Sequence, residues 1–121
     1  MKDEKLSFDE GFQKKLTVLS FGEKREVLLV FSAYYEKDGL TAEQFDSYAR
    51  FDKSQEALLP EVESRLLVDF PEAKTRFQMT MVLIQRDGTL ALLYDDDKNL
   101  DDGMALQLFP EVKMMTQDEF L

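Results

Sequence analysis

The fold of this chain is decided by residues 77–109, FQMTMVLIQRDGTLALLYDDDKNLDDGMALQLF. Apolar runs lie on both sides of the pair Asp87-Gly88, which is typical of a tight β-hairpin turn because both central residues of such a turn need positive φ. If these two residues alone form the loop, Leu83 pairs with Leu92 and the two runs become antiparallel strands. The hairpin is therefore the centre of the predicted sheet.

The predicted register gives the hairpin two apolar faces. The larger face is expected to meet the core, and a smaller apolar patch lies near the turn on the opposite face. Exposed contiguous apolar surface usually marks a contact, so this patch needs a cover. The cover could be the N-terminal segment, a partner, or a second copy of the chain, which leaves a homodimer open. The residues of this candidate contact patch are Val82, Ile84, Ala91 and Leu93.

An aspartate-rich segment, residues 95–103 (DDDKNLDDG), connects the hairpin to a third strand predicted at residues 104–109. Its 1-3-5 acidic spacing is that of a calcium loop, but an EF-hand needs glycine at the sixth position, where this chain has Leu100. No metal site is predicted. The segment is then either a solvated connection or a recognition loop held on a rigid scaffold. The candidate partner-binding residues are Asp95, Asp96, Asp97, Asp101 and Asp102.

Further strands are predicted at both ends of the chain. The apolar run at residues 27–31 is typical of a buried strand, and Gly22 lies in the turn that joins it to a weaker strand at residues 16–21. Residues 112–115 suit a short edge strand, and residues 116–119 have a second helix-capping pattern before the chain ends.

The middle of the chain predicts helices. Thr41 and Gln44 have the spacing of a capping box, which marks a helix start. Because proline is unfavourable inside a helix, Pro60 favours two helices, at residues 41–52 and 55–70. The elements together indicate an α+β fold in a single domain, residues 1–121: an antiparallel sheet of about five strands with two helices packed on one face.

Composition narrows the function classes. The chain has 15 basic and 25 acidic residues, a net charge of −10, which disfavours nucleic acid as a partner and attracts basic proteins. It contains no histidine and no cysteine, so the commonest general base and thiolate chemistry are absent. No apolar run is long enough for a membrane span. We therefore expect a cytoplasmic protein that is not an enzyme and has no cofactor and no membrane association.

Several short motifs resemble those of small acidic bacterial domain families. The matching residues span about residues 26–121 and include Gly39-Leu40-Thr41 with Gln44, Tyr48 and Phe51, then Asp95–Asp97, Asp101-Asp102-Gly103 and the ending Gln117-Asp118-Glu119-Phe120-Leu121. Some such proteins are similar to immunity proteins, which neutralise a toxin by capping it. The resemblance implies binding and no catalysis.

The leading hypothesis is a non-catalytic binding protein of immunity type. Its acidic residues, those of the loop and of the helices, would occlude a basic partner protein, with a nuclease-like toxin as one candidate. A structural or regulatory subunit that self-associates through the hairpin patch is the alternative. A metal-dependent or carboxylate-dependent enzyme is the third hypothesis.

Overall fold

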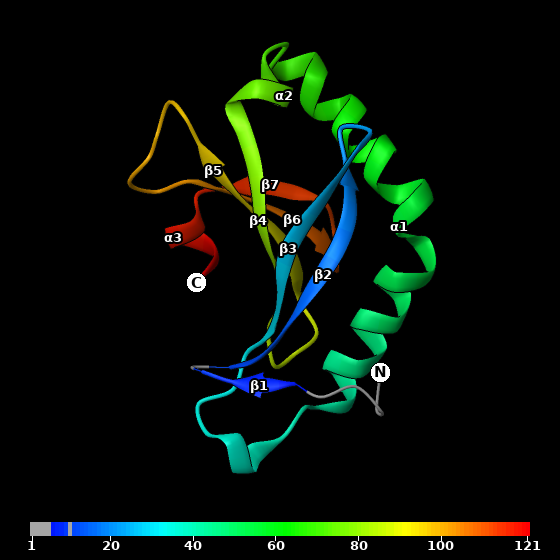
Figure 1. Ribbon diagram of the computed structural model, residues 1–121, viewed down its shortest axis with the longest axis vertical. Helices are drawn as coiled ribbons and strands as arrows, with labels where there is room; N and C mark the ends of the chain where they lie inside the picture. Colours follow the sequence, from blue (N-terminus) through cyan, green and yellow to red (C-terminus); the bar gives the residue numbers. More distant parts are fainter. Residues whose placement is uncertain (1–5, 10) are drawn as a thin grey trace.

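A seven-stranded sheet with one long helix packed on one face forms the body of the protein (Figure 1). The computed structural model describes residues 6–9 and 11–121. The predicted α+β class is confirmed, whereas the five antiparallel strands and two helices are only roughly right. The strands are β1 (Ser7–Phe8), β2 (Phe12–Ser20), β3 (Glu23–Phe31), β4 (Phe77–Ile84), β5 (Leu90–Asp96), β6 (Met104–Phe109) and β7 (Lys113–Met115). The helices are η1 (Glu36–Asp38), α1 (Ala42–Asp69), α2 (Ala73–Arg76) and α3 (Gln117–Phe120).

Strand order in the sheet follows chain order from β1 to β7. All neighbouring pairs are antiparallel except β3 and β4, in which Leu28 lies beside Met81 and Phe31 beside Ile84. The expectation of a purely antiparallel sheet was therefore wrong. The reason is the crossover: α1 carries the chain back to the end of the sheet at which β3 began, so that β4 runs in the same direction.

One continuous helix replaces the two that Pro60 favoured. α1 spans 28 residues and contains Pro60 in its interior. The missing N–H of Pro60 frees a backbone carbonyl one turn earlier, but Pro60 is exposed, so water can satisfy that group. Leu59 and Val62 are buried in the same core on either side of it. Burial of both flanks outweighs the local cost of the proline.

The predicted start of α1 is confirmed. The backbone N–H of Gln44 donates to Thr41 Oγ1 at 3.0 Å, and the backbone N–H of Thr41 donates to Gln44 Oε1 at 2.9 Å. A second capping box joins Thr116 and Glu119 at the start of α3. Both boxes satisfy backbone donors that the first turn of a helix leaves free.

The hairpin of β4 and β5 exists, but its predicted register was wrong by one residue. Leu83 pairs with Ala91, not with Leu92. Gly88 N donates to Gln85 O and Gln85 N donates to Thr89 O, both at 2.8 Å, so the loop has three residues. Gly88 has φ of 91°, the positive value that such a loop needs at its last position.

The register change divides the predicted contact patch. Because side chains alternate between faces, a shift of one residue moves every side chain of one strand to the other face. Val82 and Ile84 are fully buried in the core beneath α1, so they cannot form a contact surface. Ala91 and Leu93 lie on the opposite face, in a second cluster that includes Phe120 of α3. α3 is thus one intramolecular cover of that second face (Figure 1).

The described part of the chain contains no helix that is both long and apolar enough to cross a bilayer. α1 has the length for it, but charged residues occur throughout its sequence.

Candidate functional site

Two candidate surfaces lie at opposite ends of the β4–β5 hairpin. Residues 85–89 turn the chain at one end, beside the start of α1, and residues 97–103 connect β5 to β6 at the other end (Figure 1). The first end carries a pocket, and the second carries the aspartate-rich loop that the sequence singled out.

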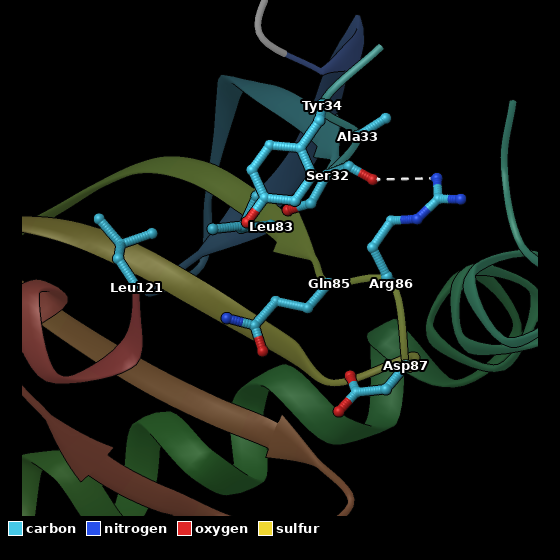
Figure 2. Close-up of a pocket in the computed structure, with 8 residues that line it drawn as sticks. All are labelled: Ser32, Ala33, Tyr34, Leu83, Gln85, Arg86, Asp87 and Leu121. Carbon is cyan, nitrogen blue, oxygen red and sulfur yellow. Dashed lines mark hydrogen bonds between the residues drawn. The ribbon is translucent and has the colours of Figure 1, made fainter. Parts of the chain in front are cut away.

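The pocket opens where the parallel strands β3 and β4 end, and its volume is about 740 Å³. Its size is in the range of ligand-binding pockets. Figure 2 shows the lining side chains, which come from the segment after β3, the end of β4, the β4–β5 turn and the last residue of the chain. The lining residues are Ser32, Ala33, Tyr34, Leu83, Gln85, Arg86, Asp87 and Leu121.

Gln44 braces the strand ends beside this pocket. Its Nε2 donates to the carbonyl oxygens of Ser32 at 2.9 Å and Ile84 at 3.1 Å, which join the ends of β3 and β4 to α1. Gln44 is completely buried. Arg86 adds a second brace by donating from Nη1 to Gly39 O at 2.6 Å and to Ser32 O at 3.4 Å. The pocket wall is therefore held by long-range hydrogen bonds.

The pocket rim carries exposed aromatic surface. Tyr34, one of the lining residues, is 91% exposed. Asp87 lies on the same rim, and hydrogen bonding from Thr89 lowers the pKa of its carboxyl group. Exposed tyrosine beside a pocket is a common feature of protein-binding surfaces.

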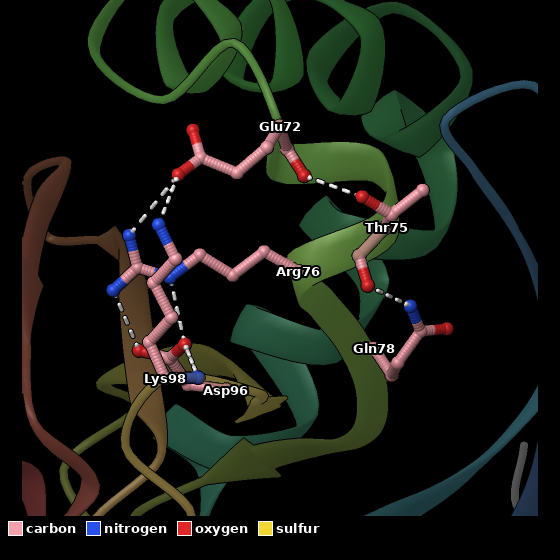
Figure 3. Close-up of polar contacts among 6 residues, drawn as sticks. All are labelled: Glu72, Thr75, Arg76, Gln78, Asp96 and Lys98. Atoms are coloured by element: carbon pink, nitrogen blue, oxygen red, sulfur yellow. Dashed lines mark hydrogen bonds and ion pairs between the residues drawn. The ribbon is translucent and has the colours of Figure 1, made fainter.

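At the other end, Asp96 is the anchor of the aspartate-rich loop. Only 5% of Asp96 is exposed, and its carboxylate binds Arg76 through two hydrogen bonds, from Nε at 2.7 Å and from Nη2 at 3.1 Å (Figure 3). The hydrogen bond from Arg76 is the main reason why the pKa of Asp96 lies below its usual value. The prediction that Asp96 faces a partner is wrong, because its carboxylate is buried in this pair.

Arg76 is itself held by aromatic rings. Its guanidinium carbon lies 4.9 Å from the ring centre of Phe70 and 4.8 Å from that of Phe77. It also pairs with Glu72 at 3.8 Å, and Glu72 accepts from Lys98 Nζ at 3.0 Å (Figure 3). Asp96 and Lys98, the residues at the two ends of this network, both belong to the aspartate-rich segment.

Backbone hydrogen bonds fix the rest of the loop. Asp97 N donates to Arg76 O at 3.1 Å, and Gly103 N donates to Asn99 O at 2.9 Å. Gln117 of α3 donates from Nε2 to Tyr94 O at 2.8 Å, packed where a side chain at Gly103 would clash. The loop is therefore ordered by its own contacts before any partner arrives.

Four of the five predicted aspartates remain on the surface. All four are exposed and make no ion pair with a residue that the structure describes. The backbone N–H of Gln117 donates to Asp102 O at 3.3 Å, which holds the start of α3 beside the loop. α3 therefore adds the exposed Asp118, a residue that the sequence did not single out. We call this set the acidic surface: Asp95, Asp97, Asp101, Asp102 and Asp118.

No three carboxylates converge to hold a metal ion within residues 6–9 and 11–121. The acidic surface therefore presents separated negative charges to solvent. Such an arrangement can attract and steer a positively charged protein.

Comparisons of this chain with protein-family models, with curated proteins and with solved structures found no match in any of the three.

Proposed function

We propose that the protein is a cytosolic, non-catalytic binding protein of immunity type, which occludes a basic surface of a partner protein through the acidic surface. The observation that carries this proposal is the division of labour among the aspartates. Asp96 is buried in an ion pair with Arg76 that fixes the loop, whereas the side chains of its neighbours Asp95 and Asp97 are exposed to solvent. A loop fixed in advance loses little conformational entropy when a partner binds.

Charge supplies the recognition. The protein carries a net charge of −10, so a basic partner is attracted over the whole surface and docks where uncompensated charge is concentrated. Exposed charges of this kind change the association rate constant and its dependence on salt more than they change the dissociation rate.

A capture experiment tests the proposal. The immobilised protein is compared with a loop variant in which Asp95, Asp97, Asp101 and Asp102 are replaced by asparagine, which keeps shape and removes four charges. The matched control removes four exposed carboxylates from α1 instead: Asp46→Asn, Asp52→Asn, Glu56→Gln and Asp69→Asn.

The proposal requires that a basic protein from the native cells is retained by the original chain and by the helix control, and is lost from the loop variant. Equal retention by the loop variant, or equal loss from both variants, contradicts a specific role for the acidic surface. In the second case only net charge would matter.

The pocket supports a second candidate function, binding of an apolar side chain of a protein partner beside Tyr34. The high exposure of this tyrosine next to a cavity favours it. In the same capture experiment, Tyr34→Ala would then release the partner while the loop variant retains it.

A further inference from the structure

A small groove lies between the aspartate-rich segment and residues 114–119. Its volume is about 240 Å³. Pockets that hold whole small molecules begin at roughly 300 Å³, so this groove suits a single side chain of a larger molecule. It is separate from the pocket beside Tyr34, because no described residue lines both.

Much of the groove is lined by phenylalanine and methionine. Phe77 and Met104 are buried in the core, whereas Met114 of β7 is 47% exposed. Phe70 and Met115 line the groove as well and are half-buried. Methionine is flexible and polarisable, so Met114 and Met115 can adapt their shape to an incoming side chain.

The charged groups within the groove are already engaged. The side chain of Arg76 is 18% exposed and lies 2.7 Å from the carboxylate of Asp96 (Figure 3). Glu119 Oε1 accepts hydrogen bonds from the backbone N–H of Thr116 at 3.1 Å and from its hydroxyl at 3.2 Å. A cation that entered the groove would lose water and find both carboxylates engaged, whereas an apolar side chain needs no such partner.

The acidic surface surrounds this groove. Four of its five aspartates are next in the chain to a residue that lines the groove. Lys98 and Lys113 are also next to lining residues, but Lys98 pairs with Glu72 at 3.0 Å. Negative charge therefore dominates the rim and favours lysine or arginine on either side of a bound apolar side chain. The four aspartates are Asp95, Asp97, Asp102 and Asp118.

We propose that the groove anchors the partner by taking one apolar side chain from a segment in which the neighbouring residues are lysine or arginine. This inference rests on the proposed function, because those basic residues would contact the acidic surface. It adds the chemistry of the recognised segment, an apolar residue between cations. The anchor would act mainly on the dissociation rate, whereas the aspartates act on the association rate.

Two synthetic heptapeptides test the proposal. The probe has tryptophan at its centre and lysine at the other positions, and the reference peptide has alanine in place of the tryptophan. Fluorescence anisotropy of a dye at the N-terminus of each peptide measures both affinities. The protein contains no tryptophan, so the tryptophan emission of an unlabelled probe reports only on the peptide.

The original chain should bind the tryptophan peptide about tenfold more tightly than the alanine peptide, which is the effect of a well-buried anchor residue. The tryptophan emission should also shift to shorter wavelength on binding, because the indole ring leaves water. This second measurement needs no variant of the protein.

Met114→Gln makes the groove more polar at nearly constant side-chain length and adds no charge. It should remove most of the preference for tryptophan and leave the affinity for the alanine peptide unchanged. Leu19→Gln is the matched control, since Leu19 is 49% exposed and lies in β2, and it should keep the preference. Circular dichroism checks the fold of each variant.

The loop variant separates this inference from the proposed function. Removing four aspartate charges should weaken the binding of both peptides to the same extent. The ratio of the two affinities should stay the same, because the apolar lining of the groove is unchanged.

Equal affinity of the original chain for the two peptides overturns the inference. So does a preference for tryptophan that Met114→Gln leaves unchanged, or that Leu19→Gln removes as strongly. These results leave the proposed function standing if the loop variant still weakens the binding of both peptides. A loop variant that binds both peptides as tightly as the original chain contradicts the proposed function instead, and no binding of either peptide contradicts both.

Discussion

Replacing Gln44 with alanine should loosen the junction at which β3, β4 and α1 meet. The side chain is completely buried and makes three hydrogen bonds, to Thr41 N, Ser32 O and Ile84 O. Ile84 O also accepts from Ser32 N at 2.9 Å, so it keeps one partner, whereas no other acceptor serves the N–H of Thr41 among the described contacts.

The magnitude follows from these contacts. Each of the two carbonyl bonds is worth about 1 kcal/mol net, and leaving the partly buried N–H of Thr41 without an acceptor costs about 1–2 kcal/mol. Gln44→Ala should therefore lower the free energy of unfolding by about 3–4 kcal/mol. Urea denaturation followed by circular dichroism measures this quantity.

The second capping box provides the control. Glu119 makes the equivalent bond to Thr116 N at 3.1 Å, but it is exposed and braces no strand. Glu119→Ala should cost at most about 1 kcal/mol, the usual effect of losing an exposed cap. If Gln44→Ala and Glu119→Ala cost the same, the bridge from α1 to the ends of β3 and β4 contributes nothing to stability, and the reasoning fails.

Three further outcomes are expected. Burial raises the pKa of Glu63, so its contribution to the free energy of unfolding is complete below the unfolded-state pKa of 4.5 and is lost as pH rises through the folded value. Glu63→Gln should therefore be more stable than the original chain at pH 7. Urea midpoints of the two proteins that differ as much at pH 4 as at pH 7 would refute this. The lowered pKa of Asp96 has the opposite sign: its contribution to stability is present above pH 3.8 and is lost as pH falls through the folded value. Asp96→Asn should therefore flatten the decline of stability in acid, and an equally steep decline in this variant would contradict the prediction. Val82→Ala opens a cavity beneath α1 and should lower the free energy of unfolding, measured by chemical denaturation, by roughly 2–3 kcal/mol. A much smaller loss would mean that Val82 lies on the surface.

Local signals in the sequence were sufficient for some elements. The capping box at Thr41 and Gln44 located the start of α1, because both bonds form within one helical turn. Pro60 misled for the converse reason. Its cost is local, but the burial of Leu59 and Val62 against a sheet formed by distant residues decides that the helix continues.

Loop length in the hairpin shows a second limit. Asp87-Gly88 marks the turn correctly, but glycine with positive φ serves both two-residue and three-residue loops. The contacts that select the longer loop are tertiary: Thr41 Oγ1 donates to Arg86 O at 2.7 Å, and Gly88 lies against the backbone of Glu43. Because the loop is one residue longer than predicted, the register shifts, and Val82 and Ile84 lie in the core and not on the predicted contact patch.

The candidate site divides in the same way. Aspartates in a polar loop are predicted to be exposed, and four of them are. The buried role of Asp96 could not be predicted, because its partner Arg76 lies 20 residues earlier in the chain and is held beside the rings of Phe70 and Phe77. The same holds for Gln117, which joins α3 to the loop.

The most direct test of the acidic surface is the association rate constant with the captured partner, measured by surface plasmon resonance as a function of salt. For the loop variant, we expect this rate constant at low salt to fall by about tenfold or more and its salt dependence to flatten. The helix control, with four charges removed from α1, should keep most of both. If the two variants slow association equally, the acidic surface has no specific role in recognition, and the central claim is contradicted.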